Sequence, residues 1–237
     1  MKHVVLPDNC KRHLAFYLAM EQFVADNMDD DAFFIWRVGP TVIIGRNQIL
    51  ENEVNLDYCR LHGISLVRRR SGGGCVYSDE GNIMISYISR RGTVSGVFDS
   101  YISLMTDALK SLGLPAEYSG RNDILINGRK VSGNAFRQLP SRSVVHGTLL
   151  YSSDIEALEQ AIKPPQEKLD RHGIESVRQR VMNLKDYIQV KSDVHAALNT
   201  VESLESFLTD RFCDGEIRLA PADVKAIENM SSEYQQH

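Results

Sequence analysis

The sequence predicts an α+β fold in which mixed and antiparallel sheets are flanked by helices. Runs of β-branched and aromatic residues bounded by turn residues, over 32–45, 64–89 and 120–151, are typical of strands. Long helical periodicities flank these runs, over 13–28 and 97–112. With 237 residues, 43% of them hydrophobic and 24% charged, the chain suits one large domain, with or without a small appendage.

In the first half of the chain, apolar periodicity predicts helices over 13–28, 54–62 and 97–112. The third helix is expected to stop at Gly113, before Pro115. The expected strands lie over 32–38 and 41–45, joined across Gly39-Pro40, and over 64–67 and 83–89, which flank a glycine-rich loop.

The second half is expected to begin with a meander of strands over 120–151, interrupted by a loop over 137–142. Asp154 is a good N-cap for a helix over 155–162, which Pro164-Pro165 would stop. The remaining expected elements are a helix over 192–212, a strand over 215–219 and a last helix with Pro221 in its first turn.

Composition and charge exclude several classes of protein. A net charge of −4 provides no general basic field, so a nucleic-acid partner is not expected. No apolar run reaches the length of a membrane span, and the N-terminus is too short for a secretory signal, so we expect a cytoplasmic protein without a membrane partner. Scattered cysteines without a Cys-x-x-Cys pair indicate reduced thiols and no zinc site; they are Cys10, Cys59, Cys75 and Cys213.

Asn127-Gly128 is a strong β-hairpin signal, because both central positions of a type I′ turn need a positive φ. The expected register pairs Ile126 with Arg129, Leu125 with Lys130, Ile124 with Val131 and Asp123 with Ser132. On this register Asp123, Lys130 and Ser132 share the less apolar face, with the first two as diagonal neighbours at about 7–8 Å. A carboxylate there can hold a metal ion or a nucleotide while an ammonium reaches the adjacent phosphate. The alternative is a surface hairpin with a solvated lysine.

A glycine-rich segment over 68–79 lies between two strand-like runs. Its three consecutive glycines, Gly72 to Gly74, allow backbone N–H groups to converge on an anion. Arg68 to Arg70 add planar charged groups suited to phosphate or carboxylate. No Gly-x-x-x-x-Gly-Lys-Ser/Thr pattern occurs, so this is not a Walker loop. The segment indicates an anion-binding loop, against the alternative of a flexible turn.

A third segment, over 144–151, alternates so that His146 and Thr148 share one strand face with Leu150. Val145 and Leu149 point the other way, toward the expected core. A single histidine near a strand is more often structural than catalytic. His146 is therefore informative only together with the other segments.

Taken together, these segments resemble the lipoate–protein ligase family and, more distantly, the wider biotin/lipoate ligase and octanoyltransferase group. The resemblance extends over nearly the whole chain, in the family's order and approximate spacing. It implies a biotin/lipoate-ligase-like catalytic domain. The matching segments lie at 14–21, 42–48, 68–77, 120–123, 129–135, 146–150 and 174–184.

The resemblance implies an ATP-dependent ligase that works in two steps. Lipoate attacks the α-phosphate of ATP to give lipoyl-AMP and pyrophosphate, and a lysine of a lipoyl-acceptor domain then attacks the mixed anhydride. The implied cofactors are ATP and Mg²⁺, with lipoate as substrate. The implied partners are lipoyl-acceptor domains of 2-oxoacid dehydrogenase complexes or the glycine cleavage H protein, and the expected state is a monomer.

The family's functional positions fall on this sequence residue by residue. Its catalytic lysine matches Lys130, whose charge would contact both the lipoyl carbonyl and the α-phosphate. Asp123 also matches the implied Mg²⁺ ligand. The positions implied to bind ATP or the adenylate are Arg69, Gly73, Gly74, Cys75, Val76, Tyr77, Asn122, Asp123 and Lys130. The positions implied to bind lipoate are Ser71, Gly72, Lys130, Ser132, Gly133, Arg137 and His146.

Two positions depart from the family pattern: Cys75 stands where Ala is commoner, and Ser78 stands where His is frequent. Cys75 permits an alternative, an ATP-independent octanoyl or lipoyl transferase in which a thiolate carries the acyl group. Packing under an adenine is the simpler role, because it needs only a small side chain. A non-enzymatic alternative is a sensor that binds lipoate or nucleotide.

A reactive anhydride must be kept from water, so we expect a loop over 137–143 or 171–180 to close over it. The expected organisation is a catalytic core over 1–190 and a helix–strand–helix extension of the same domain over 191–237. The small second domain of many relatives is expected to be absent. A transfer-only enzyme that uses preformed lipoyl-AMP is therefore a further alternative.

Overall fold

The computed structural model describes residues 1–90, 93–140, 142–162, 180–189 and 195–234. It contains an eight-stranded sheet and a three-stranded sheet, which confirms the predicted α+β class. The larger sheet is mixed, since β1 pairs in parallel with both β11 and β2 whereas the other pairs are antiparallel. Its strands, in spatial order, are β11 (Gly215–Arg218), β1 (Lys2–Val5), β2 (Ala32–Trp36), β6 (Asn82–Ser89), β10 (Ser143–Leu150), β9 (Arg129–Gln138), β8 (Asp123–Ile126) and β7 (Ala116–Tyr118). The smaller sheet has the order β4 (Ser65–Arg68), β3 (Thr41–Ile44) and β5 (Val76–Ser78).

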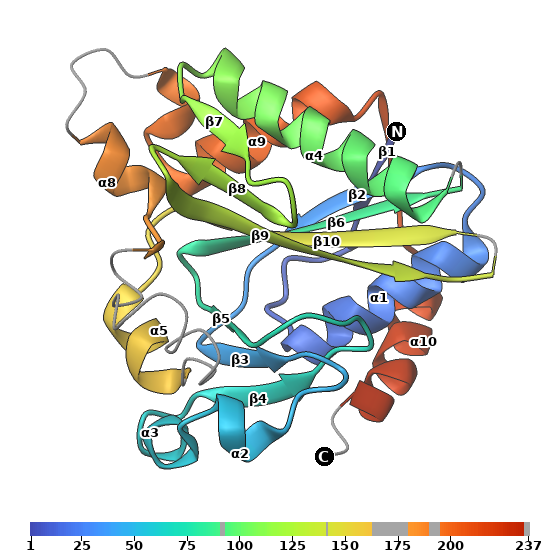
Figure 1. Cartoon of the computed structure of the whole chain (residues 1–237). Coiled ribbons are helices and arrows are strands. Elements are labelled where there is room, and N and C mark those ends of the chain that lie inside the picture. Colours follow the sequence, from blue (N-terminus) through green and yellow to red (C-terminus); the bar gives the residue numbers. More distant parts are fainter. Residues whose placement is uncertain (91–92, 141, 163–179, 190–194, 235–237) are drawn as a thin grey trace.

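Helices cover both faces of the larger sheet (Figure 1). On one face lie α4 (Val94–Ser111) and α9 (Val201–Phe212), and on the other lie α1 (Leu14–Asn27) and α10 (Pro221–Ser231). The shorter helices are α2 (Leu50–Glu53), α3 (Leu56–Leu61), α5 (Ile155–Ala161), α8 (Leu184–Ile188), η1 (Ala196–Leu198) and η2 (Ser232–Tyr234). No helix in the described ranges is both long enough and apolar enough to cross a bilayer.

The central strand β6 shows how the sequence builds these layers. Ile83, Ile85 and Tyr87 belong to the core under α4 and α9, whereas Met84 and Ile88 belong to the core under α1 and α10. All eight residues of β6 are buried, as expected for a strand that is covered on both faces. Because side chains alternate along a strand, the even-numbered residues of β6 lie on the face of α1 and α10, and Asn82 and Met84 at its start line the cavities described below.

The smaller sheet lies against its own apolar cluster, to which α3 and α5 contribute. Figure 1 shows it below the larger sheet, with β3, β4 and β5 beside α2 and α3. Cavities lined by β5 of the smaller sheet and by β8, β9 and β10 of the larger one separate the two sheets. The fold therefore brings the glycine loop opposite the 122–148 region.

Several predicted elements are confirmed with adjusted ends, and others are wrong. The strand β5 was not expected, because it follows directly on the glycine loop and has only three residues. The strands predicted around Gly39-Pro40 exist, but they belong to different sheets. The continuous helix over 192–212 is wrong within the described range, since η1 ends at Leu198 and Thr200 caps a separate helix, α9. The predicted breaks at Pro164-Pro165 lie outside the described residues.

The predicted hairpin forms, but its register changes after two pairs. Asn127 and Gly128 have φ angles of 50° and 75°, and Ile126 pairs with Arg129 and Leu125 with Lys130, as expected. Further along, the pairs are Ile124 with Ser132 and Asp123 with Gly133, so the predicted pairs with Val131 and Ser132 are wrong. One extra residue on β9, at the fully buried Val131, forms this β-bulge.

The bulge exchanges two candidate site residues between faces. Ser132 was predicted to share the face of Lys130. Instead it is buried beside Asn134, with its Oγ 3.3 Å from Asn134 Oδ1. Gly133 takes that place, because a Cβ built there would lie 2.6 Å from Lys130 Nζ. The prediction that Ser132 contributes to the site thus finds no support in its position.

Candidate active site

Two adjoining cavities lie between the sheets. The larger has a volume of about 340 Å³ and the smaller about 180 Å³. Seven residues line both cavities and mark their junction: Gly74, Cys75, Val76, Asp123, Lys130, Gly133 and Thr148. The glycine loop and the hairpin, predicted separately from the sequence, thus meet at one place.

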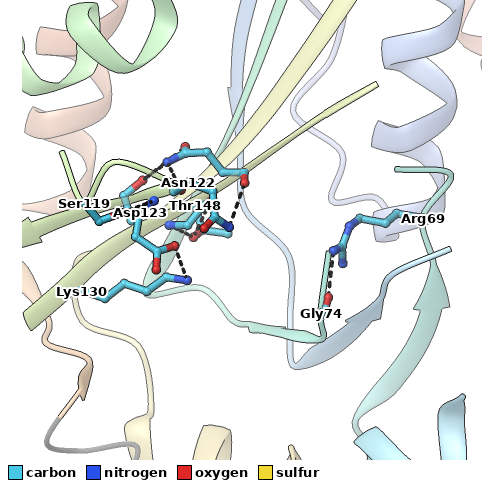
Figure 2. A network of polar contacts seen from close by, with 10 residues as sticks. Arg69, Gly74, Ser119, Asn122, Asp123, Lys130 and Thr148 are labelled. Carbon is cyan, nitrogen blue, oxygen red and sulfur yellow. Dashed lines mark hydrogen bonds and ion pairs between the residues drawn. The ribbon is translucent and has the colours of Figure 1, made fainter. Parts of the chain in front are cut away.

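Lys130 is held at this junction by its neighbours. Its Nζ lies 2.8 Å from Asp123 Oδ1, and the two side chains are 34% and 28% exposed (Figure 2). Thr148 Oγ1 accepts from the Gly133 N–H at 3.1 Å and donates to the Gly133 carbonyl at 3.2 Å, which fixes the backbone beneath the lysine. The result is a positioned ammonium that is open to both cavities.

Asn122 and Asn134 fix the chain immediately before Asp123. Asn134 Nδ2 donates to the Asn122 carbonyl at 3.0 Å, and Asn122 Nδ2 donates to the Asn134 carbonyl at 3.4 Å. The Asp123 N–H donates to Ser119 Oγ at 3.2 Å. Figure 2 shows Ser119, Asn122 and Asp123 in one cluster, with Arg69 and Gly74 apart from it.

Arg69 holds the glycine loop together from within. Its Nη2 donates to the carbonyls of Gly72 and Gly74 at 2.7 and 2.8 Å, and its Nε lies 3.0 Å from Ser71 Oγ. The side chain is 6% exposed, and this burial lowers the pKa of the guanidinium. Gly73 has a φ of 95°, where a Cβ would also lie 2.8 Å from Arg69 Nη2. Arg69 thus holds the shape of the loop and also lines the 180 Å³ cavity.

The other two arginines of the cluster also have protein partners. Arg68 Nη1 donates to the carbonyls of Gly45 and Gln48 at 3.0 and 2.8 Å. Arg70 forms an ion pair with Glu233 and stacks over the ring of Tyr234 at 4.5 Å. Arg68 and Arg69 thus support backbone carbonyls in this structure, and the expected role of the three arginines as anion contacts stays a prediction.

His146 belongs to a buried polar chain that the sequence did not reveal. Its Nε2 lies 2.6 Å from Ser71 Oγ, and its Nδ1 lies 3.1 Å from Glu21 Oε2. Glu21 Oε1 accepts from Ser86 Oγ at 2.7 Å, and Trp36 Nε1 donates to the same hydroxyl at 2.9 Å. The one available signal was a glutamate within the apolar stretch of α1, where an unpaired charge would be costly.

Cys75 lines both cavities, but its environment does not favour a thiolate. Burial, with a further contribution from Glu53, raises the pKa of the Cys75 thiol to about 11. A nucleophilic cysteine usually has a lowered pKa, because the thiolate is the reactive form. The structure therefore favours a packing role for this side chain.

The remaining predicted site residues divide between the cavities and a wider cleft. Val76 and Tyr77 line the 340 Å³ cavity, and Tyr77 is buried. Ser71, Gly72 and Arg137 line an adjoining cleft of about 1410 Å³, together with Arg46, Arg70 and Arg121. Two segments were expected to close over the site. Residues 171–179 of the segment 171–180 lie outside the described residues, and the first two residues of the segment 137–143 belong to β9, which ends at Gln138.

At the junction of the two cavities a metal ion would meet the carboxylate of Asp123, and Glu53 lines the larger cavity elsewhere. Within the described ranges, no group of three or more His, Cys, Asp or Glu side chains is placed to hold a metal. Mg²⁺ commonly binds through one or two carboxylates and the phosphates of a nucleotide. Asp123 fits that limited role, although it is paired with Lys130 in this structure.

Comparisons with known proteins agree with this arrangement. Residues 13–203 match the family profile described as the lipoyl protein ligase A/B catalytic domain. The chain is 35% identical to lipoate–protein ligase 1 of Staphylococcus aureus over 91% of its own length and 66% of that protein's. It is 34% identical to lipoate-protein ligase A of Bdellovibrio bacteriovorus over 98% of its own length and 69% of that protein's. The chain thus spans about two thirds of the length of these relatives.

Solved structures show the same fold. A structure of a bi-partite lipoate protein ligase from Thermoplasma acidophilum superposes with a TM-score of 0.83 at 25% identity, over 100% of this chain and 95% of that one. A lipoate-protein ligase A bound with ATP superposes with a TM-score of 0.82 at 23% identity, over 100% of this chain and 96% of that one. The family inferred from the motifs is confirmed: this chain belongs to the lipoyl protein ligase A/B catalytic-domain family.

Proposed function

We propose that this protein is an ATP-dependent lipoate–protein ligase, which makes lipoyl-AMP and transfers the lipoyl group to a lysine of an acceptor domain. The observation that carries the proposal is the Lys130 ammonium, held by Asp123 at the junction of two cavities. Two substrates that must meet at one reacting centre need such a junction. The names of the relatives support the same activity.

The linings of the two cavities support an assignment of one substrate to each. The 340 Å³ cavity is lined by aliphatic side chains from several elements and would take the nucleotide, whose base needs an apolar slot. The 180 Å³ cavity extends from Lys130 past Met84 to His146 and would take the acid. In this arrangement the lipoate carboxylate and the α-phosphate both approach Lys130 Nζ.

In the first step, a carboxylate oxygen of lipoate attacks the α-phosphorus, and the bond from that phosphorus to the bridging oxygen breaks to release pyrophosphate. In the second step, the neutral ε-amine of the acceptor lysine attacks the lipoyl carbonyl carbon. The carbon–oxygen bond to AMP then breaks, and the amine loses its proton. Negative charge develops on phosphate oxygens in the first step and on the carbonyl oxygen in the second. A fixed ammonium lowers both barriers without having to reorganise.

The backbone and polar groups around Lys130 would bind and orient these substrates. We assign adenylate contacts to Gly73, Gly74, Cys75, Val76, Tyr77 and Asn122, and acid contacts to Ser71, Gly72, Gly133, Arg137 and His146. Asp123 and the nucleotide phosphates would hold Mg²⁺, which offsets phosphate charge when bound. The narrowness of both cavities limits water around the reactive anhydride.

The acceptor would approach through the wide cleft that adjoins the cavities. Four arginines line it: Arg46, Arg70, Arg121 and Arg137. A positive rim of this kind favours encounter with an acidic protein surface. Lipoyl-acceptor domains of 2-oxoacid dehydrogenase complexes, or the glycine cleavage H protein, are the acceptors we propose.

An ATP-independent transferase is the main alternative within the same family. It would need a reactive cysteine in the site, and the raised pKa of Cys75 opposes that role. A transfer-only enzyme remains distinct from both, because it would use lipoyl-AMP without making it.

The test is pyrophosphate release by the purified chain with Mg·ATP and (R)-lipoate, followed by addition of an acceptor domain and mass spectrometry. The proposal predicts release that depends on lipoate, and then a lipoyl mass shift on the acceptor. Acceptor modification only from supplied lipoyl-AMP would establish the transfer-only enzyme. Modification from an acyl carrier protein without ATP would establish the transferase.

A further inference from the structure

The turn η2 brings the end of α10 against the glycine loop. Tyr234, the last residue of the turn, is buried in the apolar core that α1 and α10 share. The guanidinium of Arg70 lies over the Tyr234 ring, 4.5 Å from its centroid, and Arg70 Nη2 forms an ion pair with the carboxylate of Glu233. Two consecutive residues of the turn therefore hold one arginine of the loop, one through its ring and the other through its carboxylate.

These two contacts differ in how firmly they are fixed. The Tyr234 ring is packed in the core, whereas the side chains of Arg70 and Glu233 are 39% and 64% exposed. An ion pair that is this open to water contributes little to stability. The contact between the guanidinium and the ring does not depend on the carboxylate. Another carboxylate could therefore replace that of Glu233 while Arg70 stays in place.

Arg70 also belongs to the unbalanced charge of the wide cleft. Among the described residues, four arginines and one carboxylate, that of Asp99, line this cleft. Of the four arginines, Arg70 alone has a carboxylate partner within the described ranges. That partner, Glu233, is not a lining residue, so it offsets one positive charge of the cleft from outside. A positive surface attracts an acidic partner, and Glu233 competes with such a partner for Arg70.

We propose that Glu233 occupies the place on Arg70 that an acidic side chain of the acceptor domain takes when the acceptor docks in the cleft. The incoming carboxylate displaces that of Glu233, while Tyr234 keeps the guanidinium in position. A guanidinium has five N–H donors in one plane and can bind the incoming carboxylate through two of them. This inference rests on the proposed function for the kind of partner, and it adds one docking contact and an internal competitor for it.

Calorimetric titration with an unmodified lipoyl domain of a 2-oxoacid dehydrogenase complex tests this exchange without turnover. Glu233→Gln should lower the Kd at least about threefold at about 0.02 M salt, and the difference should vanish at about 0.5 M salt, where exposed charges are screened. The matched control is Glu228→Gln, which removes the same charge from the exposed face of α10 and should keep the wild-type Kd. Arg70→Ala should raise the Kd, and adding Glu233→Gln to it should change nothing further.

The outcomes separate this inference from the proposed function. Unchanged or weaker binding by Glu233→Gln, equal tightening by Glu228→Gln, or no binding by any form overturns the exchange, even if the chain makes lipoyl-AMP. Tighter binding by Glu233→Gln alone, with no pyrophosphate release by the wild type, supports the exchange and removes the ligase activity. Where the chain is active, Glu233→Gln should leave the KM for lipoate unchanged. A changed KM for lipoate would place Arg70 at the acid instead and contradict the proposal.

Discussion

Lys130 Nζ and Asp123 Oδ1 lie 2.8 Å apart although a β-bulge separates their positions in the hairpin. A regular register would make them diagonal neighbours, whereas the bulge pairs Asp123 with Gly133 and lets the long lysine side chain reach across. The contact therefore depends on the missing Cβ at Gly133 as much as on the two charges.

Replacing Asp123 by Asn should weaken catalysis more than stability. The pair is about one third exposed, so its loss should change the free energy of unfolding by about 1 kcal/mol or less. Without the carboxylate the ammonium is no longer fixed, and pyrophosphate release should fall by about tenfold or more. Urea denaturation and release assays on the same preparation measure both effects. Unchanged release would show that Lys130 needs no counter-charge.

Gly133→Ala should displace Lys130 without unfolding the protein. A Cβ at this position would lie 2.6 Å from Nζ and 2.8 Å from Cε, and the end of a flexible side chain can move away. We expect the rate of adenylate formation to fall at least about tenfold, with a melting temperature within about 4 °C of the wild type. Gly39→Ala is the control, since nothing lies within 4 Å of its Cβ. Equal activity in both variants would contradict the close approach.

Arg69→Lys should loosen the glycine loop although it keeps the charge. An ammonium cannot reproduce the planar contacts to Gly72 and Gly74, so its charge would stay buried with fewer acceptors. The expected loss is at least about 2 kcal/mol in the free energy of unfolding. Arg70→Lys should cost less than about 1 kcal/mol, because its ion pair with Glu233 is exposed. Comparable losses in the two variants would show that Arg69 does not support the loop.

The Cys75 thiol should resist alkylation at neutral pH. With a pKa of about 11, only about one thiol in a thousand is ionised at pH 8. Its alkylation rate should rise with pH up to about 11, measured by mass spectrometry of the Cys75 peptide. Because folding raises this pKa above the ordinary value of 9.0, the resulting stabilisation is full below pH 9 and is lost as the pH rises through about 11.

Cys75→Ser should retain most of the ligase activity, within about fivefold of the wild type. The change preserves size, which is what packing beside a base requires. A loss of more than about a thousandfold would restore the nucleophile hypothesis. Cys10→Ser is the control, because it removes an exposed thiol away from the cavities and should leave the activity unchanged.

The turn residues predicted the hairpin, whereas packing against distant elements decided the register of its strands beyond the turn. Asn127-Gly128 specifies the turn through its own φ angles, so the first two pairs were correct. The bulge beyond them depends on where Val131 and Ser132 fit under α4, which no nearby residue encodes. The same limit explains why Ser132 was assigned to the wrong face.

The candidate site was predictable where its residues lie in short motifs. Lys130, Asp123, Gly74 and Cys75 meet at the cavity junction as the motifs implied. Glu21 could not be found in this way, because its partner His146 lies 125 residues away. The sequence indicated that the arginine cluster binds anions. It could not show that Arg69 donates to the carbonyls of Gly72 and Gly74, because those carbonyls converge on it only in the folded loop.

If Lys130 serves both half-reactions, both must fail when it is replaced, so the decisive measurement assays each half-reaction of Lys130→Ala separately. We expect lipoate-dependent pyrophosphate release and transfer from supplied lipoyl-AMP both to fall by at least about 100-fold. The melting temperature should stay within about 4 °C of the wild type, and Lys225→Ala, on the exposed face of α10, should change neither rate. Loss of only one half-reaction would contradict a shared role for Lys130 at the cavity junction.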